Sequence, residues 1–224
     1  MVQGTVVSIP VGGAHLAGDL SIPAQAEGVV LFAHGSGSSR RSPRNRFVAG
    51  RLQDAGLATL LMDLLTPAEE VLDEESAGRL RFDIRFLARR LEAASSWLAR
   101  GSGTAGLRLG YFGASTGAAA ALVAAAEWTG EVGAIVSRGG RPDLAGRALG
   151  AVRAPTLLVV GGDDDAVIPL NRQALDRLRC EKRLEIVPGA THLFEEPGTL
   201  ERVAELAAGW FSRHLGARGA GSGR

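Results

Sequence analysis

Short apolar runs alternate along the chain with longer segments whose apolar residues recur at helical spacing. The runs cover residues 28–34, 57–63, 107–112, 132–136 and 155–160, and a last strand is expected over 183–187. A strand without polar alternation is stable only where both of its faces are covered, as in parallel sheets flanked by helices. The alternation therefore predicts an α/β fold with a mostly parallel central sheet and helices on both faces.

The N-terminal segment departs from this pattern. Residues 2–9 and 15–22 have the character of two strands, and Gly12 and Gly13 between them suit a tight turn, so we expect an antiparallel hairpin. A single domain is expected over residues 1–215, because one α/β domain commonly has this size. The stretch 66–78 is acidic and offers at most a small flap, so no large lid domain is predicted. Residues 216–224 are rich in glycine and are expected to form a flexible tail.

Charge, hydropathy and cysteine content exclude several functional classes. The 25 basic and 24 acidic side chains give a net charge of +1, which predicts no general attraction to nucleic acid or to an anionic membrane. The longest uncharged apolar stretch, residues 118–126, is about half the length that spans a bilayer. The N-terminus has no signal-peptide pattern, and the single cysteine, Cys180, allows no internal disulfide. We therefore expect a cytoplasmic protein.

The strongest local signal is the sequence GASTG at residues 113–117, which fits G-x-S-x-G between a predicted strand and a predicted helix over 118–128. A nucleophile elbow holds its serine in a strained backbone conformation with the hydroxyl exposed. Small residues two positions before and two after the serine let the strand and the helix approach each other. The motif predicts Ser115 as a nucleophile. The alternative is a glycine-rich turn that only packs a helix on the sheet.

A serine hydroxyl needs a base to remove its proton, and the chain has four histidines. Only His192, in a loop after the last predicted strand, lies where this fold returns a loop over the elbow; a surface histidine is the alternative. His34 ends a strand before a glycine-serine loop, and we expect it to shape that loop. The base also needs an orienting carboxylate. Three aspartates at residues 163–165 follow a buried strand, spacing does not choose among them, and two of them can cap the next helix.

Stabilisation of an oxyanion requires two hydrogen-bond donors, usually backbone amides. The amide of Thr116, directly after Ser115, is expected to supply one of them. Ser36 lies between two glycines in the loop after the strand 28–34, and its amide is expected to supply the other.

The sequences HGSG, GASTG, GGDDDAV and GATH, in this order, resemble the α/β-hydrolases, and more closely the dienelactone-hydrolase-like group of small members without a lid. The resemblance runs from about residue 28 to 215 and implies the α/β-hydrolase fold, with its chain order of Ser, Asp and His. The family's acid motif, Gly-x-x-Asp-x-x-Val, laid on Gly161 and Val167, selects Asp164. Dienelactone hydrolase carries a cysteine at the elbow, so Ser115 favours ordinary ester chemistry.

These residues predict a serine hydrolase that cleaves small carboxylic esters through an acyl-enzyme on Ser115. Its partner is a small-molecule ester, and neither a cofactor nor a metal is expected. The same motifs serve a thioesterase or a lactonase, and a catalytically inert binding module is a further alternative. A nucleotide- or phosphate-binding protein is disfavoured, because the chain lacks both the G-x-G-x-x-G fingerprint and the P-loop motif.

Arginines follow two of the predicted strands on the carboxyl side of the sheet. Arginine binds carboxylates with two parallel hydrogen bonds. Arg41, in the loop after the strand 28–34, and Arg138, after the run 132–136, are therefore candidates for binding an anionic group of the substrate. Solvated or ion-paired surface arginine is the alternative.

Overall fold

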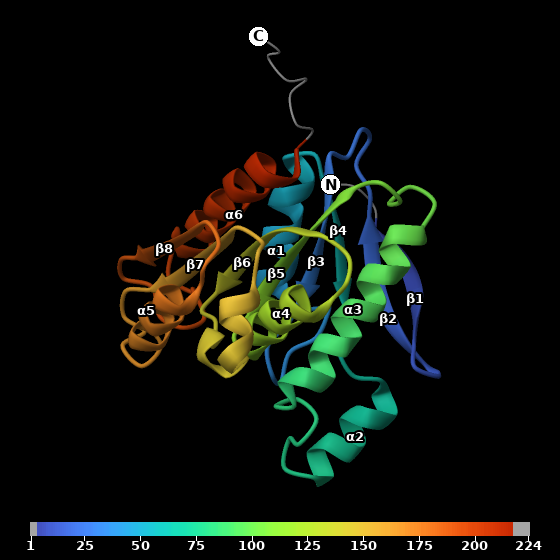
Figure 1. Cartoon of the computed structure of the whole chain (residues 1–224), viewed down its shortest axis with the longest axis horizontal. Helices are drawn as coiled ribbons and strands as arrows, with labels where there is room; N and C mark the ends of the chain where they lie inside the picture. Colours follow the sequence, from blue (N-terminus) through green and yellow to red (C-terminus); the bar gives the residue numbers. More distant parts are fainter. Residues whose placement is uncertain (1–3, 217–224) are drawn as a thin grey trace.

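The computed structural model describes residues 4–216 and contains an eight-stranded sheet (Figure 1). In sheet order the strands are β1 (Thr5–Val11), β2 (Ala14–Ser21), β4 (Leu57–Met62), β3 (Gly28–Ala33), β5 (Arg108–Ala114), β6 (Val132–Arg138), β7 (Thr156–Gly161) and β8 (Lys182–Val187). β2 pairs antiparallel with β1 and β4, and all other neighbours are parallel. The predicted hairpin and mostly parallel sheet are confirmed. Residues 2 and 3 of the expected first strand, and residues 217–224 of the expected tail, lie outside the described residues.

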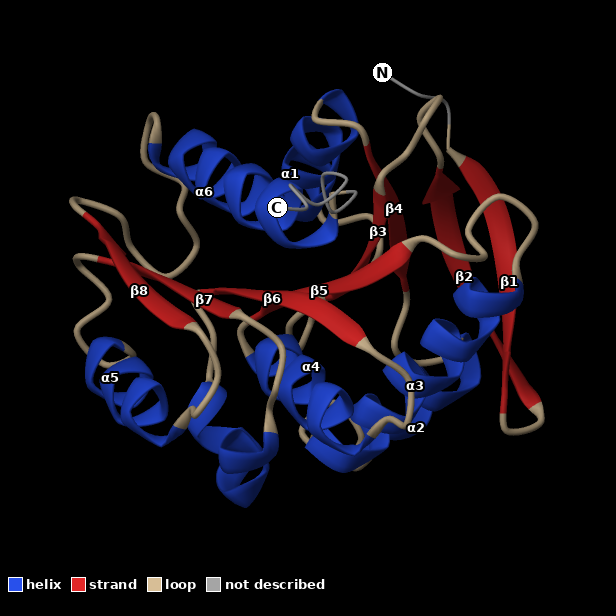
Figure 2. Cartoon of the chain, turned by 45° about the horizontal axis from the view of Figure 1, so that its top comes forward, coloured by secondary structure: helices blue, strands red, loops and turns tan. Residues whose placement is uncertain are grey.

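Helices cover both faces of the sheet (Figure 2). One face carries α1 (Pro43–Asp54) and α6 (Thr199–Leu215). The other carries α3 (Ile84–Arg100), α4 (Thr116–Glu127), α5 (Ile168–Arg177) and a 3₁₀ segment, Pro142–Ala151. No helix in the described part of the chain is long and apolar enough to cross a membrane.

The buried strands divide the core into two layers. Val30 and Phe32 of β3 pack in the layer under α1 and α6, whereas Val29 and Leu31 pack in the layer under α3 and α4. All six residues of β3 are buried, and so are all six of β4 and β7. This is why these runs are almost entirely apolar, with Thr59 in β4 and Thr156 in β7 as the polar members. Each fully buried aliphatic side chain contributes about 1.5–3 kcal/mol. The core therefore lies on both faces of the sheet whose carboxyl edge carries the candidate site.

The acidic stretch after β4, expected to offer at most a small flap, forms a helix, α2 (Pro67–Glu75). Thr66 and Glu69 make a reciprocal capping box at its start, a signal that the sequence T-P-A-E carries. The buried carboxylate of Asp73 then accepts hydrogen bonds from the amides of Leu80 (2.6 Å) and Arg81 (3.0 Å) and pairs with the Arg81 guanidinium. These amides are held in a turn, and α3 begins after it, at residue 84.

Candidate active site

Ser115 lies in a sharp turn between β5 and α4, with φ 50° and ψ −123°. A positive φ is rare for a residue other than glycine and is typical of a strained functional position. Glycines on both sides make the turn possible. A Cβ on Gly113 would lie 2.4 Å from Cα of Ala118, and one on Gly117 would lie 2.2 Å from the carbonyl oxygen of Ala33. The strand and the helix therefore approach as the motif predicted.

Asp164 and His192 are joined by a hydrogen bond of 2.7 Å between Oδ2 and Nδ1. Asp164 follows β7 in a turn and is buried, with 8% of its side chain exposed. Its neighbours Asp163 and Asp165 are exposed. Of the three aspartates, Asp164 is thus the one whose carboxylate contacts the ring. With Nδ1 donating to a carboxylate, Nε2 of the imidazole is left as the basic nitrogen.

The loops after β7 and β8 carry this pair, and contacts through the loop after β6 bring it beside the elbow. The amide of Ser115 donates to the carbonyl oxygen of Arg138 at the end of β6. A Cβ on the next residue, Gly139, would lie 3.6 Å from Cε1 of His192. Among the described residues no hydrogen bond joins the Ser115 hydroxyl to the His192 ring. Such bonds are often long in the absence of substrate and tighten when it binds.

Sequence reasoning missed the residues that hold the His192 loop. The carboxylate of Glu196 accepts hydrogen bonds from the amide (3.1 Å) and the hydroxyl (2.6 Å) of Thr191. The Thr191 hydroxyl is the main cause that lowers the pKa of Glu196. Phe194 is buried under the loop with φ 56°. Only a three-dimensional structure could have revealed these contacts, because nothing in the sequence links these residues to the elbow.

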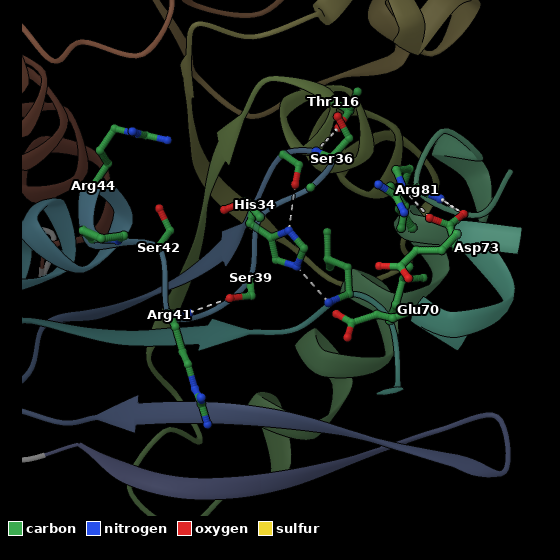
Figure 3. A pocket seen from close by; sticks show the side chains of 18 residues that line it. His34, Ser36, Ser39, Arg41, Ser42, Arg44, Glu70, Asp73, Arg81 and Thr116 are labelled. Carbon is green, nitrogen blue, oxygen red and sulfur yellow. Dashed lines mark hydrogen bonds and ion pairs between the residues drawn. The ribbon is translucent and has the colours of Figure 1, made fainter. Parts of the chain in front are cut away.

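His34 orders the loop after β3 (Figure 3). The amide of Leu64 donates to its Nε2 (3.1 Å), and its Nδ1 lies 2.9 Å from the carbonyl oxygen of Gly35. Since an amide can only donate, Nε2 is unprotonated and Nδ1 carries the proton. The ring is therefore neutral, and burial lowers its pKa below the usual value. This agrees with a structural role for His34.

The two residues expected to stabilise an oxyanion lie side by side. Thr116 is the first residue of α4, so its amide lies at the open N-terminal end of the helix. The amide of Ser36 donates to Oγ1 of Thr116 at 3.0 Å (Figure 3). The structure thus brings Ser36 to the elbow, but with its amide directed at a side chain.

A cavity of about 520 Å³ lies against this loop and the start of α4 (Figure 3). Thr116, the residue after Ser115, lines this cavity. Its apolar wall includes Leu64, Leu65 and Leu87, and its charged wall includes Arg41, Arg44 and Glu70. Such a mixed lining suits a ligand with both apolar and polar parts. No group of three or more potential metal ligands occurs within residues 4–216.

The two candidate arginines are placed differently. Arg41 lines the cavity, and its amide donates to the Ser39 hydroxyl. Arg138 is buried, with 6% exposed, and Nη2 donates to Oδ1 of Asn45 at 3.2 Å. Burial, with a smaller effect of the nearby Arg44, lowers its pKa to about 10. Within the described residues no carboxylate forms an ion pair with Arg138.

Comparison with known proteins gives the family. The family model described as "Dienelactone hydrolase family" matches residues 16–214. Two Mycobacterium tuberculosis proteins, from strains CDC 1551 and H37Rv, are each provisionally named as a phosphoribosyl transferase and are 57% identical over 210 residues. The match covers 93% of this chain but 46% of those proteins. The chain therefore spans about half the length of the curated relatives it matches.

Solved structures agree with the family model. A dienelactone hydrolase from Anabaena variabilis is 59% identical, with a TM-score of 0.93 over 96% of this chain and 99% of that one. A Xanthomonas campestris α/β serine hydrolase without a lid is 19% identical, with a TM-score of 0.76 over 96% of each chain, and shows the fold alone. The resemblance seen in the sequence motifs is confirmed. This chain belongs to the dienelactone hydrolase family and has the α/β-hydrolase fold.

Proposed function

We propose that the chain is a serine hydrolase that cleaves small carboxylic esters, with Ser115 as nucleophile, His192 as base and Asp164 as the orienting acid. The observation that carries this proposal is the 2.7 Å hydrogen bond between His192 and Asp164 beside a strained serine turn. A carboxylate that fixes the imidazole tautomer is the arrangement that serine hydrolysis requires. Membership of the family supports a hydrolase, and the serine at the elbow supports ester chemistry.

The proposed reaction uses these three residues in turn. The Ser115 hydroxyl oxygen bonds to the ester carbonyl carbon, its proton passes to Nε2 of His192, and the carbonyl electron pair moves onto the oxygen. Collapse of this intermediate breaks the bond to the leaving alcohol, which takes the proton from His192. Water then attacks the acyl group by the same route and releases the acid and free Ser115.

The test is hydrolysis of p-nitrophenyl acetate by the wild type, Ser115→Ala and, as a matched control, Ser102→Ala. Ser102 is exposed in the turn after α3, remote from the elbow. Ser115→Ala is expected to abolish turnover and Ser102→Ala to keep it. Full activity in Ser115→Ala would refute the assignment.

Two alternatives with the same fold are separated by further assays. A fluorophosphonate probe labels an activated serine, so an inert binding module would remain unlabelled. A thioesterase or a lactonase would label, but would show its highest kcat/KM on a thioester or a lactone in a panel of matched acyl groups. We expect labelling that Ser115→Ala removes, and a preference for small oxygen esters.

A narrower part of the proposal is that Arg41 or Arg138 binds an anionic group of the substrate. Arg41 faces the cavity, and Arg138 is a buried cation without a carboxylate partner in the described chain. The measurement is kcat/KM for a neutral ester and for a carboxylate-bearing analogue in Arg41→Ala and Arg138→Ala. A loss confined to the charged ester in one variant is expected. Equal losses for both esters in both variants would remove this part.

The name of the Mycobacterium tuberculosis relatives describes proteins about twice as long as the shared segment. We propose that the transferase reaction which this name describes belongs to the part of those proteins outside the segment, because the shared segment folds as an α/β hydrolase. This chain is then expected to transfer no phosphoribosyl group from phosphoribosyl pyrophosphate. A cytoplasmic location belongs to the same proposal and rests on the single free cysteine, Cys180.

A further inference from the structure

The amide of Ser36 has a fixed direction. The carbonyl oxygen of Gly35 belongs to the same planar peptide as this amide. That oxygen accepts hydrogen bonds from Nδ1 of His34 (2.9 Å) and from the amide of Ser38 (3.2 Å). With the carbonyl held at one end, the N–H at the other end donates to Oγ1 of Thr116 at 3.0 Å. The donor expected for an oxyanion is therefore already bonded to a side chain.

The Thr116 hydroxyl has one donor proton and two acceptor lone pairs. Ser36 uses one of the lone pairs, and in the described part of the chain the Thr116 hydroxyl donates no hydrogen bond. Thr116 is 5% exposed and lines the cavity. It directly follows Ser115 in the chain. The loop after β3 packs against Ser115, because a Cβ on Gly35 would lie 3.0 Å from Cβ of Ser115. A buried hydroxyl with an unused proton thus borders the cavity next to the nucleophile.

We propose that Thr116 is a catalytic residue whose side-chain hydroxyl donates a hydrogen bond to the oxyanion, in place of the Ser36 amide. The backbone amide of Thr116, at the start of α4, supplies the other donor. Ser36 is then a positioning residue. By donating to Oγ1 it orients the hydroxyl and strengthens it as a donor, because hydrogen bonds in a chain polarise one another. The proton stays on Thr116 throughout. This inference rests on the proposed serine hydrolysis and adds a donor to it.

The test compares Thr116→Val with Thr116→Ser on p-nitrophenyl acetate. Valine keeps the branched shape, removes the hydroxyl and frees the Ser36 amide, whereas serine keeps the hydroxyl. Thr116→Val is expected to lower kcat on the order of 10²–10³-fold, the usual loss for one oxyanion donor, with KM little changed. KM is little changed because the oxyanion forms only in the transition state and the intermediate, and not in the bound substrate. Thr116→Ser is expected to recover most of kcat.

The matched control is Thr104→Val, which removes another buried threonine hydroxyl, bonded to the Leu98 carbonyl (2.7 Å) beyond the opposite end of β5. It is expected to lower the melting temperature and to leave kcat unchanged. Any general effect of losing a buried hydroxyl is thereby separated from the effect at the elbow.

Other outcomes would overturn either this inference or the proposed function. A kcat for Thr116→Val equal to or above the wild-type value would make the freed Ser36 amide the direct donor and overturn the inference. So would a Thr116→Ser variant as slow as Thr116→Val, or a Thr116→Val variant in which only KM changes. Turnover that survives Ser115→Ala, or a wild type that neither turns over nor labels, would overturn the proposed function itself and this inference with it.

Discussion

Replacing Gly117 by alanine tests whether α4 and β3 approach as closely as the nucleophile turn requires. A Cβ at this position would lie 2.2 Å from the carbonyl oxygen of Ala33 and 2.5 Å from that of His34, where real Cβ contacts stay above 3.0 Å. Both obstacles are backbone atoms, so no side chain can rotate away. The start of α4 must therefore move away from the end of β3 by about 0.8 Å, the difference between the 2.2 Å contact and the 3.0 Å limit.

This movement affects stability and catalysis separately. Overpacking of this kind costs about 1–3 kcal/mol in the free energy of unfolding. For a chain of this length each kcal/mol lowers the melting temperature by about 2–4 °C. Because Ser115 belongs to the start of α4 and Ser36 to the loop after β3, the same shift separates the nucleophile from that loop. A misplacement of about 1 Å can reduce the rate by about 10²-fold.

The assay is thermal unfolding together with kcat for p-nitrophenyl acetate. Gly209→Ala, in the interior of α6, is the matched control because its Cβ would meet no atom within 4 Å. Alanine there is expected to stabilise the helix by about 0.5–1 kcal/mol without changing kcat. If Gly117→Ala has the wild-type melting temperature and kcat, the close packing of α4 on β3, and the steric reason given for the motif, are refuted.

Two further predictions concern side chains of the site. Asp164→Asn removes the carboxylate that fixes the His192 tautomer and is expected to lower kcat on the order of 10⁴-fold, measured with p-nitrophenyl acetate; a loss below tenfold would contradict the tautomer argument. His34 is neutral in the fold and its pKa is lowered by burial, so between that pKa and the unfolded value of about 6.5 the unfolded chain binds more protons. The stability due to neutral His34 is complete above about pH 6.5 and is lost as the pH falls through this window. Urea unfolding of the wild type and His34→Gln across the window is expected to show the steeper fall in the wild type, and parallel curves would contradict the assignment.

The fold could be predicted largely because its signals are local. Runs that are buried on both faces are almost entirely apolar: β3 has no polar side chain, and β4 has only Thr59. The hairpin carries two glycines at its turn, Gly12 with φ 54° and Gly13 with φ 87°. The boundary of α3 could not be predicted, because it depends on the carboxylate of Asp73 reaching the amides of Leu80 and Arg81 across a turn. Periodicity describes a helix face and carries no information on such a contact.

The candidate site likewise has a part that the sequence predicted and a part that it did not. The GASTG motif located the strained serine because its geometry demands small residues at fixed positions, and the family motif selected Asp164, whose carboxylate contacts His192. The contact of the Ser36 amide with the Thr116 hydroxyl joins residues that are 80 positions apart, so no local sequence pattern predicts it. The hydrogen bond from the buried Arg138 to Asn45 likewise joins residues that are 93 positions apart.

The described contacts also divide the site into a rigid part and an adjustable part. Ser115, Thr116 and the loop after β3 are held by close packing, which leaves no room for a side chain at residue 117 and brings Gly35 within tight contact of Ser115. Phe194 anchors the His192 loop in the core, but the residues around the imidazole are held by exposed polar contacts, among them the 2.7 Å pair of Arg44 and Glu195. Exposed pairs of this kind contribute about 0–1 kcal/mol each. In the proposed reaction the proton passes between Ser115 and His192, so we expect substrate binding to adjust this separation through the loop that carries His192.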